Sequence, residues 1–166
     1  MNVEAICTRT VRSCGPETPL AEVANLMWSA DCGALPVIDD AGRVLGIVTD
    51  RDLCLALALT SRTVSEMPVR ILLHPDTHTC RLTDGVREAL RTMRTHKVRR
   101  LPVVDGAGVL RGILSISDLA LAAKPDRLAG PSEVTDEDVS LAMKMIYGKT
   151  ALPHGEVHAP QAGTLV

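Results

Sequence analysis

The sequence contains almost no aromatic side chains. Among its 166 residues there are one Trp, one Tyr and no Phe, and aromatic residues make up 1% of the chain. A buried core must therefore be packed from Val, Ile, Leu, Ala and Met. Proteins that bind single-stranded nucleic acids stack the bases on exposed aromatic rings, so the composition argues against a nucleic-acid-binding surface of that kind.

The chain has no large excess of positive or negative charge, and it has no long apolar segment. Its 18 basic and 20 acidic residues leave a net charge of −2, which excludes a general polyanion binder. It starts with MNVEAICTRT, which has an acidic residue at position 4 and lacks the apolar stretch of a secretory signal. The longest apolar run, 53–59, is far too short to span a membrane. We therefore expect a cytoplasmic protein with no membrane partner.

Residues typical of catalytic and metal sites are sparse. None of the five cysteines belongs to a CxxC pair, and each lies among aliphatic neighbours, which is typical of small buried residues in a reducing compartment. His154 and His158 are four residues apart, but they lie in a tail rich in Pro and Gly with no third metal ligand nearby. No nucleophile is accompanied by a general base and an orienting group. We expect no enzyme activity, no metal site and no required cofactor.

An internal repeat organises most of the chain. The segment LPVID at 35–39 recurs as LPVVD at 101–105, and GIVTDRDL at 46–53 recurs as GILSISDL at 112–119. Both pairs are 66 residues apart, and the register holds without a gap over about 14–56. This match indicates two copies of one structural unit.

The hydrophobic pattern predicts the order β-α-β-β-α in both copies. Apolar residues at helical spacing follow Thr18 and Asp84, which are favourable N-cap residues, and two apolar strands follow each of these helices. A helix rich in Leu and Ala closes each copy after Thr49 and after Ser115. The predicted boundaries are a first repeat at 1–60, a linker at 61–66, a second repeat at 67–124, and a C-terminal extension at 125–166 with a short helix at about 136–147 and a loose tail.

This double motif resembles a known family. Two copies of LPVxD, each followed by an apolar strand and [ST]-x-x-D-L, look like a tandem pair of CBS (cystathionine β-synthase) domains, the Bateman module. The resemblance covers about 1–123, and the phrases at 33–37 and 98–105 look especially like small stand-alone bacterial members. It implies an α/β (α+β) fold with two β-α-β-β-α repeats related by a pseudo-twofold axis and packed sheet to sheet, plus the C-terminal helix and tail.

The resemblance also implies a ligand and its binding residues. CBS pairs bind AMP, ADP, ATP or S-adenosylmethionine in the clefts between their repeats, where the motif's hydroxyl contacts phosphate and the carboxylate three positions later holds the ribose. Carried over, these residues are Thr49 with Asp52 and Ser115 with Asp118. Each pair falls at a strand-to-helix junction, where backbone N–H groups and the helix dipole attract an anion. Further candidate ligand-binding residues lie in or beside the same motifs: Asp50, Arg51, Ser117, Gly33, Ala34, Pro36 and Pro102.

A simpler explanation of the two motif pairs stays open. The pattern [ST]-x-x-[DE] at a helix start is also a capping box, which needs no ligand. On that interpretation the clefts are vestigial, and the chain is a structural, interaction or stress-response protein. On the other, it is a non-enzymatic sensor of adenosine nucleotides.

The two copies differ in charge. The second copy carries Lys97, Arg99 and Arg100 ahead of its LPV strand, where the first copy has Ala-Asp-Cys-Gly-Ala at 30–34. The resemblance suggests that these three basic side chains point toward bound phosphates, which Arg can grip with two parallel hydrogen bonds. The sequence leaves open whether they serve the cleft of their own copy or reach across to the other.

The sequence also gives expectations about partners. No catalytic domain accompanies the two repeats, so a regulatory module of this kind would signal in trans. The resemblance implies a homodimer formed through the helices that flank the clefts, together with an unknown protein partner. Nucleic acid is not expected as a partner.

Overall fold

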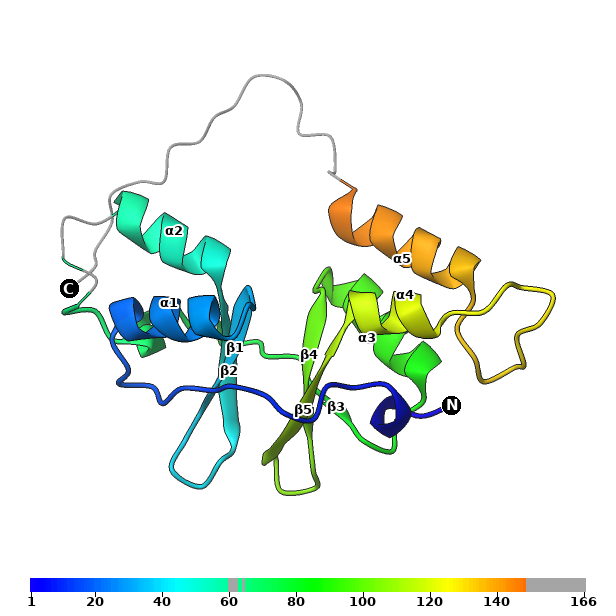
Figure 1. The fold of residues 1–166 in the computed structure, drawn as a ribbon, viewed down its shortest axis with the longest axis horizontal. Helices are drawn as coiled ribbons and strands as arrows, with labels where there is room; N and C mark the ends of the chain where they lie inside the picture. The colour runs from blue at the N-terminus through cyan, green and yellow to red at the C-terminus, as the bar shows by residue number, and fades with distance from the viewer. Residues whose placement is uncertain (60–62, 64, 149–166) are drawn as a thin grey trace, which may run out of the picture.

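The computed structural model describes residues 1–59, 63 and 65–148, and it has two halves that lie side by side (Figure 1). In the first half, α1 (Leu20–Ser29) leads into a hairpin of β1 (Ala34–Ile38) and β2 (Val44–Thr49), which is followed by α2 (Asp50–Leu59). The hairpins of the two halves face each other at the centre, and the helices lie outside them (Figure 1). This is the predicted packing of sheet to sheet.

The second half repeats the same order. Its elements are β3 (Cys80–Arg81), α3 (Val86–His96), β4 (Arg100–Val104), β5 (Leu110–Ser115) and α4 (Ile116–Ala122). The order β-α-β-β-α is thereby confirmed for this half, with β3 parallel to β4. In the first half, the strand expected at 11–14 is reduced to a single parallel bridge between Cys14 and Val37.

The two hairpins share one register. Ala34 lies opposite Thr49 in the first hairpin, and Arg100 lies opposite Ser115 in the second. Both pairings are antiparallel, and in both the register shifts between the last two residues of the first strand of the hairpin. Each hairpin thus places a motif hydroxyl, Thr49 or Ser115, beside the start of the facing strand and at the start of a helix.

The start of each repeat packs against the opposite half. The short 3-10 helix η1 (Val3–Ala5) buries Val3 in the core of the second half, whereas η2 (Val69–Leu72) buries Val69 in the core of the first. Val3 and Val69 are 66 residues apart, so the repeat register extends back to the beginning of the chain. The N-terminal segment therefore crosses from one half to the other (Figure 1).

The predicted N-caps are wrong, and the exchanged segments explain why. The first N–H of α1, at Leu20, donates to the carbonyl of Met67, and that of α3, at Val86, donates to the carbonyl of Met1. Since these crossing segments satisfy the helix starts, no side-chain cap is needed there. The hydroxyl of Thr18 and the carboxylate of Asp84 instead accept hydrogen bonds from the N–H groups three residues before them.

The buried residues are aliphatic, as the composition predicts, and form one cluster in each half. Leu20, Val23 and Leu35 are among the buried residues of the first cluster, and Leu101 and Leu114 are among those of the second. Both aromatic side chains lie outside these clusters. Trp28 is 88% exposed, and Tyr147 is 53% exposed.

The C-terminal extension adds α5 (Asp136–Tyr147) to the second half only (Figure 1). Thr135 and Asp138 form a capping box at its start, and Val139 and Ala142 are buried against the second-half cluster. Met143 of the same helix is 37% exposed. The predicted tail, with its two histidines, lies outside the described residues.

Candidate functional site

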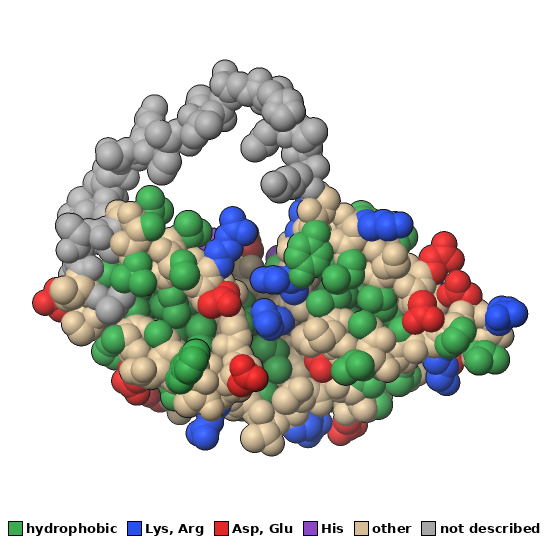
Figure 2. Space-filling model, turned by 45° about the horizontal axis from the view of Figure 1, so that its top comes forward, with side chains coloured by type: hydrophobic (Ala, Val, Ile, Leu, Met, Phe, Trp, Pro, Cys, Tyr) green, Lys and Arg blue, Asp and Glu red, His purple; other side chains and the backbone are tan. Residues whose placement is uncertain are grey.

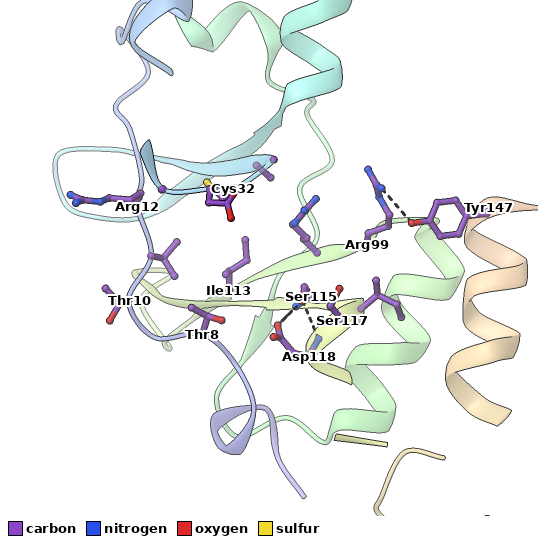
Figure 3. A pocket seen from close by; sticks show the side chains of 17 residues that line it. Thr8, Thr10, Arg12, Cys32, Arg99, Ile113, Ser115, Ser117, Asp118 and Tyr147 are labelled. Carbon is purple, nitrogen blue, oxygen red and sulfur yellow. Dashed lines mark hydrogen bonds between the residues drawn. The ribbon is translucent and has the colours of Figure 1, made fainter. Parts of the chain in front are cut away.

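A cavity of about 450 Å³ opens where the two halves meet (Figure 3). The crossing N-terminal segment lines it within 8–12, and the loop between α1 and β1 lines it at 30–34. The second half contributes the start of β4 and the β5–α4 junction at 115–118. The last turn of α5 also reaches it, through Tyr147.

The Ser115–Asp118 pair lies on the wall of this cavity and forms a capping box (Figure 3). The hydroxyl of Ser115 donates to Asp118 Oδ2 at 2.7 Å, and the backbone N–H of Ser115 donates to the same oxygen at 2.7 Å. In return, the N–H of Asp118 donates to Ser115 Oγ at 3.1 Å. Within the described residues no donor contacts Asp118 Oδ1. Capping therefore occupies one carboxylate oxygen and leaves the other available to a ligand.

The backbone N–H groups at this junction are less available than the sequence suggests. The N–H of Ile116 donates to the carbonyl of Arg99 at 2.9 Å, and that of Asp118 is used in the capping box. Side chains must therefore supply most of the attraction for an anion in this cavity.

The Thr49–Asp52 pair has the same local geometry but does not line the cavity. Thr49 donates to Asp52 Oδ2 from its backbone N–H at 2.8 Å and from its hydroxyl at 2.7 Å, and the N–H of Asp52 donates to Thr49 Oγ1 at 3.3 Å. Both motifs thus cap a helix, as the simpler interpretation predicts. Only the second motif also faces the cavity.

The surroundings of the two pairs differ. Arg12 and Ala30 line the cavity beside Ser115, and their counterparts 66 residues later are His78 and His96. The rings of these two histidines stack, with centroids 3.5 Å apart. The two positions that border the cavity as Arg12 and Ala30 are therefore occupied, in their repeat counterparts, by two histidine rings that contact each other. The two copies therefore place different side chains around their motif pairs.

The structure divides the candidate ligand-binding residues into two groups. Those that line the cavity are Gly33, Ala34, Arg99, Arg100, Ser115, Ser117 and Asp118. Those that do not line it are Thr49, Asp50, Arg51, Asp52, Lys97, Pro36 and Pro102.

Local structure accounts for several of the residues outside the cavity. Pro36 and Pro102 are buried within β1 and β4. Lys97 ends α3 in a left-handed conformation, with φ 55°, and is exposed. Asp50 lies on a separate groove between α1 and α2, and a Cβ atom at Gly33 would stand 2.9 Å from its Oδ2.

Basic side chains dominate the charge of the cavity. Arg12, Arg99 and Arg100 line it, against the carboxylates of Asp31 and Asp118. In the space-filling view, Lys and Arg side chains gather where the two halves meet (Figure 2). The cavity can therefore hold an anionic group near its guanidinium groups and a hydroxyl-bearing group near Asp118.

Several lining residues could not be predicted from the sequence motifs alone. Arg12, Asp31 and Cys32 reach the cavity because the N-terminal segment crosses over and because the α1–β1 loop faces the opposite half. The repeat register could have indicated the loop, since 30–34 corresponds to the basic segment of the second copy. Tyr147 lies outside the repeat, and no feature of the sequence connects it with the motifs.

Two further findings concern residues 1–59, 63 and 65–148. In this part of the chain, no helix is both long and apolar enough to cross a bilayer. The same residues bring together no group of three His, Cys, Asp or Glu side chains that could hold a metal ion.

Curated relatives share the repeat. An uncharacterized 17.7 kDa protein of Acidianus ambivalens is 36% identical over 120 residues, which are 72% of this chain and 71% of that protein. The CBS domain-containing protein YhcV of Bacillus subtilis is 30% identical over 129 residues, or 78% of this chain and 90% of that protein. The inosine-5′-monophosphate dehydrogenase of Mycobacterium leprae is 34% identical over 108 residues, but the match spans only 19% of that enzyme.

Solved structures share the fold. CBSX2 in complex with AMP is 29% identical, with a TM-score of 0.64 over 73% of this chain and 94% of that one. A CBS-domain containing protein from Agrobacterium tumefaciens is also 29% identical, with a TM-score of 0.66 over 74% of this chain and 98% of that one. The CBS domain family itself matches twice, at residues 3–59 and 64–124. The chain therefore belongs to the CBS domain family and carries a tandem pair of CBS domains.

Proposed function

We propose that the protein is a non-enzymatic regulatory module that binds AMP, ADP or ATP in the cavity between its two repeats and signals in trans. The observation that carries the proposal is the pairing of Asp118 with Arg99 and Arg100 on the wall of one cavity. A carboxylate that accepts hydrogen bonds from ribose hydroxyls is a common device of nucleotide sites. The guanidinium groups supply bidentate donors for phosphate oxygens.

The size and charge of the cavity support the same ligand class. A volume of about 450 Å³ lies within the usual range for small-ligand pockets. Arg99 and Arg100 favour a phosphate over the sulfonium cation of S-adenosylmethionine, because like charges repel. The relative CBSX2 is known in complex with AMP, which supports a nucleotide as the ligand here.

The proposal assigns one nucleotide to each chain. Asp52 caps α2 as Asp118 caps α4, but only Asp118 lines the cavity. The stacked rings of His78 and His96 stand at the positions that correspond to two of the cavity's lining residues. We expect the second nucleotide site of a symmetric CBS pair to be absent.

Calorimetry with a panel of ligands tests this function. AMP, ADP, ATP, adenosine and S-adenosylmethionine are titrated into the protein, with GMP as a control for base selectivity. We expect one adenosine nucleotide per chain and a matching rise in melting temperature, since a ligand that binds only the native state stabilises it. No binding of any of them at millimolar concentration would favour a structural or interaction protein with vestigial clefts.

A matched pair of arginine variants tests the assigned role of the basic side chains. Arg100→Ala removes a cation that lines the cavity, whereas Arg91→Ala removes an exposed cation of α3 that does not. A lost charge-assisted hydrogen bond costs about 1.5–3 kcal/mol. Arg100→Ala should therefore weaken nucleotides at least tenfold and adenosine little, while Arg91→Ala changes neither. Equal losses for nucleotides and adenosine would contradict phosphate binding by Arg100.

The proposal includes a homodimer formed through the outer helices. Leu55 and Leu121 take matching positions on α2 and α4 and are 47% and 88% exposed, and Trp28 on α1 is 88% exposed. Apolar side chains gathered on exposed helix faces are typical of interaction surfaces. Light scattering should give twice the mass of the 17.7 kDa chain, and Trp28→Glu with Leu121→Glu should halve it. A wild-type monomer at all concentrations would exclude the dimer.

A further inference from the structure

The C-terminal helix contributes a side chain to the cavity. Tyr147, in the last turn of α5, lines the cavity beside Arg99 (Figure 3). It is the only Tyr in the chain. Among the described residues, the first half has no helix in the corresponding place, so this contact has no counterpart by internal symmetry (Figure 1).

Tyr147 contacts one of the arginines assigned to phosphate. Arg99 Nη1 donates to the Tyr147 hydroxyl at 3.3 Å, and the guanidinium carbon lies 5.7 Å from the centre of the tyrosine ring. The contact is a hydrogen bond to a hydroxyl and not an ion pair with a carboxylate, so no acidic side chain is spent on holding this guanidinium. A guanidinium has five N–H donors, and this contact uses one of them.

The position of Tyr147 is fixed from the other end of α5. Thr135 and Asp138 close a capping box at the start of the helix. Arg87 on α3 forms an ion pair with Asp138 at 3.2 Å and also donates to the carbonyl of Glu133 at 3.1 Å. Together with the buried residues of α5, these contacts hold the helix on the second half.

We propose that Tyr147 is a positioning residue for Arg99, and that α5 is thereby coupled to occupancy of the nucleotide cavity. The inference rests on the proposed function, because it assumes that Arg99 binds phosphate. A side chain that is already held near its bound position loses less freedom when the ligand arrives, so the contact raises affinity for phosphate-bearing ligands. By linkage, a bound phosphate stabilises the docked position of α5 to the same extent.

Two variants of Tyr147 and a control on the same helix test the positioning role. Tyr147→Phe removes only the hydroxyl and should weaken AMP about two- to tenfold. Tyr147→Ala also removes the ring and should weaken AMP a further two- to fivefold. Met145→Ala, a change at an exposed α5 residue outside the cavity lining, should leave AMP affinity unchanged. Adenosine, which lacks phosphate, should bind all four proteins alike. A merely structural role of Tyr147 would weaken both ligands together.

Fluorine NMR tests the coupling directly. Because the chain has a single Tyr, incorporation of 3-fluorotyrosine gives one ¹⁹F resonance that reports on this contact. Saturating AMP should shift the resonance, and saturating adenosine should shift it less. If the wild-type protein binds AMP, but the resonance does not move or Tyr147→Ala matches Met145→Ala, the inference is wrong and the proposed function stands. If the wild-type protein binds no adenosine ligand, both are wrong.

Discussion

The two motif carboxylates form a matched pair that separates folding from binding. Asp52 and Asp118 each accept two hydrogen bonds on Oδ2 from the hydroxyl residue three positions earlier. Replacing either by Ala removes the same capping contacts, and loss of a helix cap typically costs about 0.5–2 kcal/mol. We therefore expect Asp52→Ala and Asp118→Ala to lower the free energy of unfolding by similar amounts.

Ligand binding should distinguish the same two variants. Of these two carboxylates, only that of Asp118 lines the cavity. Its Oδ1 accepts no hydrogen bond from the described residues. Each charge-assisted hydrogen bond to a ribose hydroxyl contributes about 1.5–3 kcal/mol, so its loss should weaken binding roughly 10- to 150-fold. Asp118→Ala should have this effect on adenosine, and Asp52→Ala should leave its affinity within about twofold.

Denaturant unfolding measures the free energy of unfolding of each variant, and calorimetry measures its affinity for adenosine. Adenosine is the better probe than AMP, because removing a carboxylate also relieves its repulsion of phosphate. If Asp52→Ala weakens adenosine binding as strongly as Asp118→Ala does, Asp118 has no special role in holding the ribose. Equal stability losses with unequal affinity losses would support it.

Three further predictions concern stability and reactivity. A Cβ atom at Gly112 would stand 2.8 Å from the carbonyl oxygen of Thr8, so Gly112→Ala should lower the free energy of unfolding by about 1–3 kcal/mol in urea titrations. Gly106→Ala is the control, because no described atom lies within 4 Å of a Cβ atom at Gly106, and it should leave the free energy of unfolding unchanged. Hydrogen bonds from Arg111 and the backbone lower the pKa of Asp105 below its usual value of 3.8, so its contribution to stability is complete above that pH and is lost as pH falls below it. Asp105→Asn should therefore flatten the acid limb of the stability profile, and an unchanged limb would contradict this assignment. Burial raises the pKa of Cys14 to about 11 and of Cys80 to about 12, so at pH 8 a thiol reagent should label exposed Cys54 first and reach the other two only on unfolding.

Most of the fold follows from the repeat. The two copies match without a gap at an offset of 66 residues, which forces them into one register. The structure places Ala34 opposite Thr49 just as it places Arg100 opposite Ser115. The exchanged starts of the repeats could not be predicted, because the repeat register makes Val3 and Val69 equivalent but does not say which half buries each of them. The N-caps were missed for the same reason, since a long-range carbonyl replaces the side-chain cap at each helix start.

The site follows from the sequence less completely. The motif predicts the chemistry of a hydroxyl and a carboxylate at a helix start, and that local geometry forms in both halves. Local sequence cannot tell which of the two pairs faces a cavity, because the crossing N-terminal segment and the α1–β1 loop build the facing wall. Tyr147 is even less accessible to prediction, because its approach to Arg99 depends on how α5 packs against α3.

The asymmetry between the halves bears on how such a module could regulate. If the two clefts were equivalent and contacted only the repeats, a ligand would affect both halves alike. No element outside the repeat would then be coupled to ligand binding. Here the lined cavity is the one that α5 reaches, and α5 leaves the repeat at the end of the second half. A partner that recognises the docked helix would therefore respond to the bound nucleotide through Arg99 and Tyr147, without contacting the ligand. Since linkage is reciprocal, the same partner would raise the nucleotide affinity of the module.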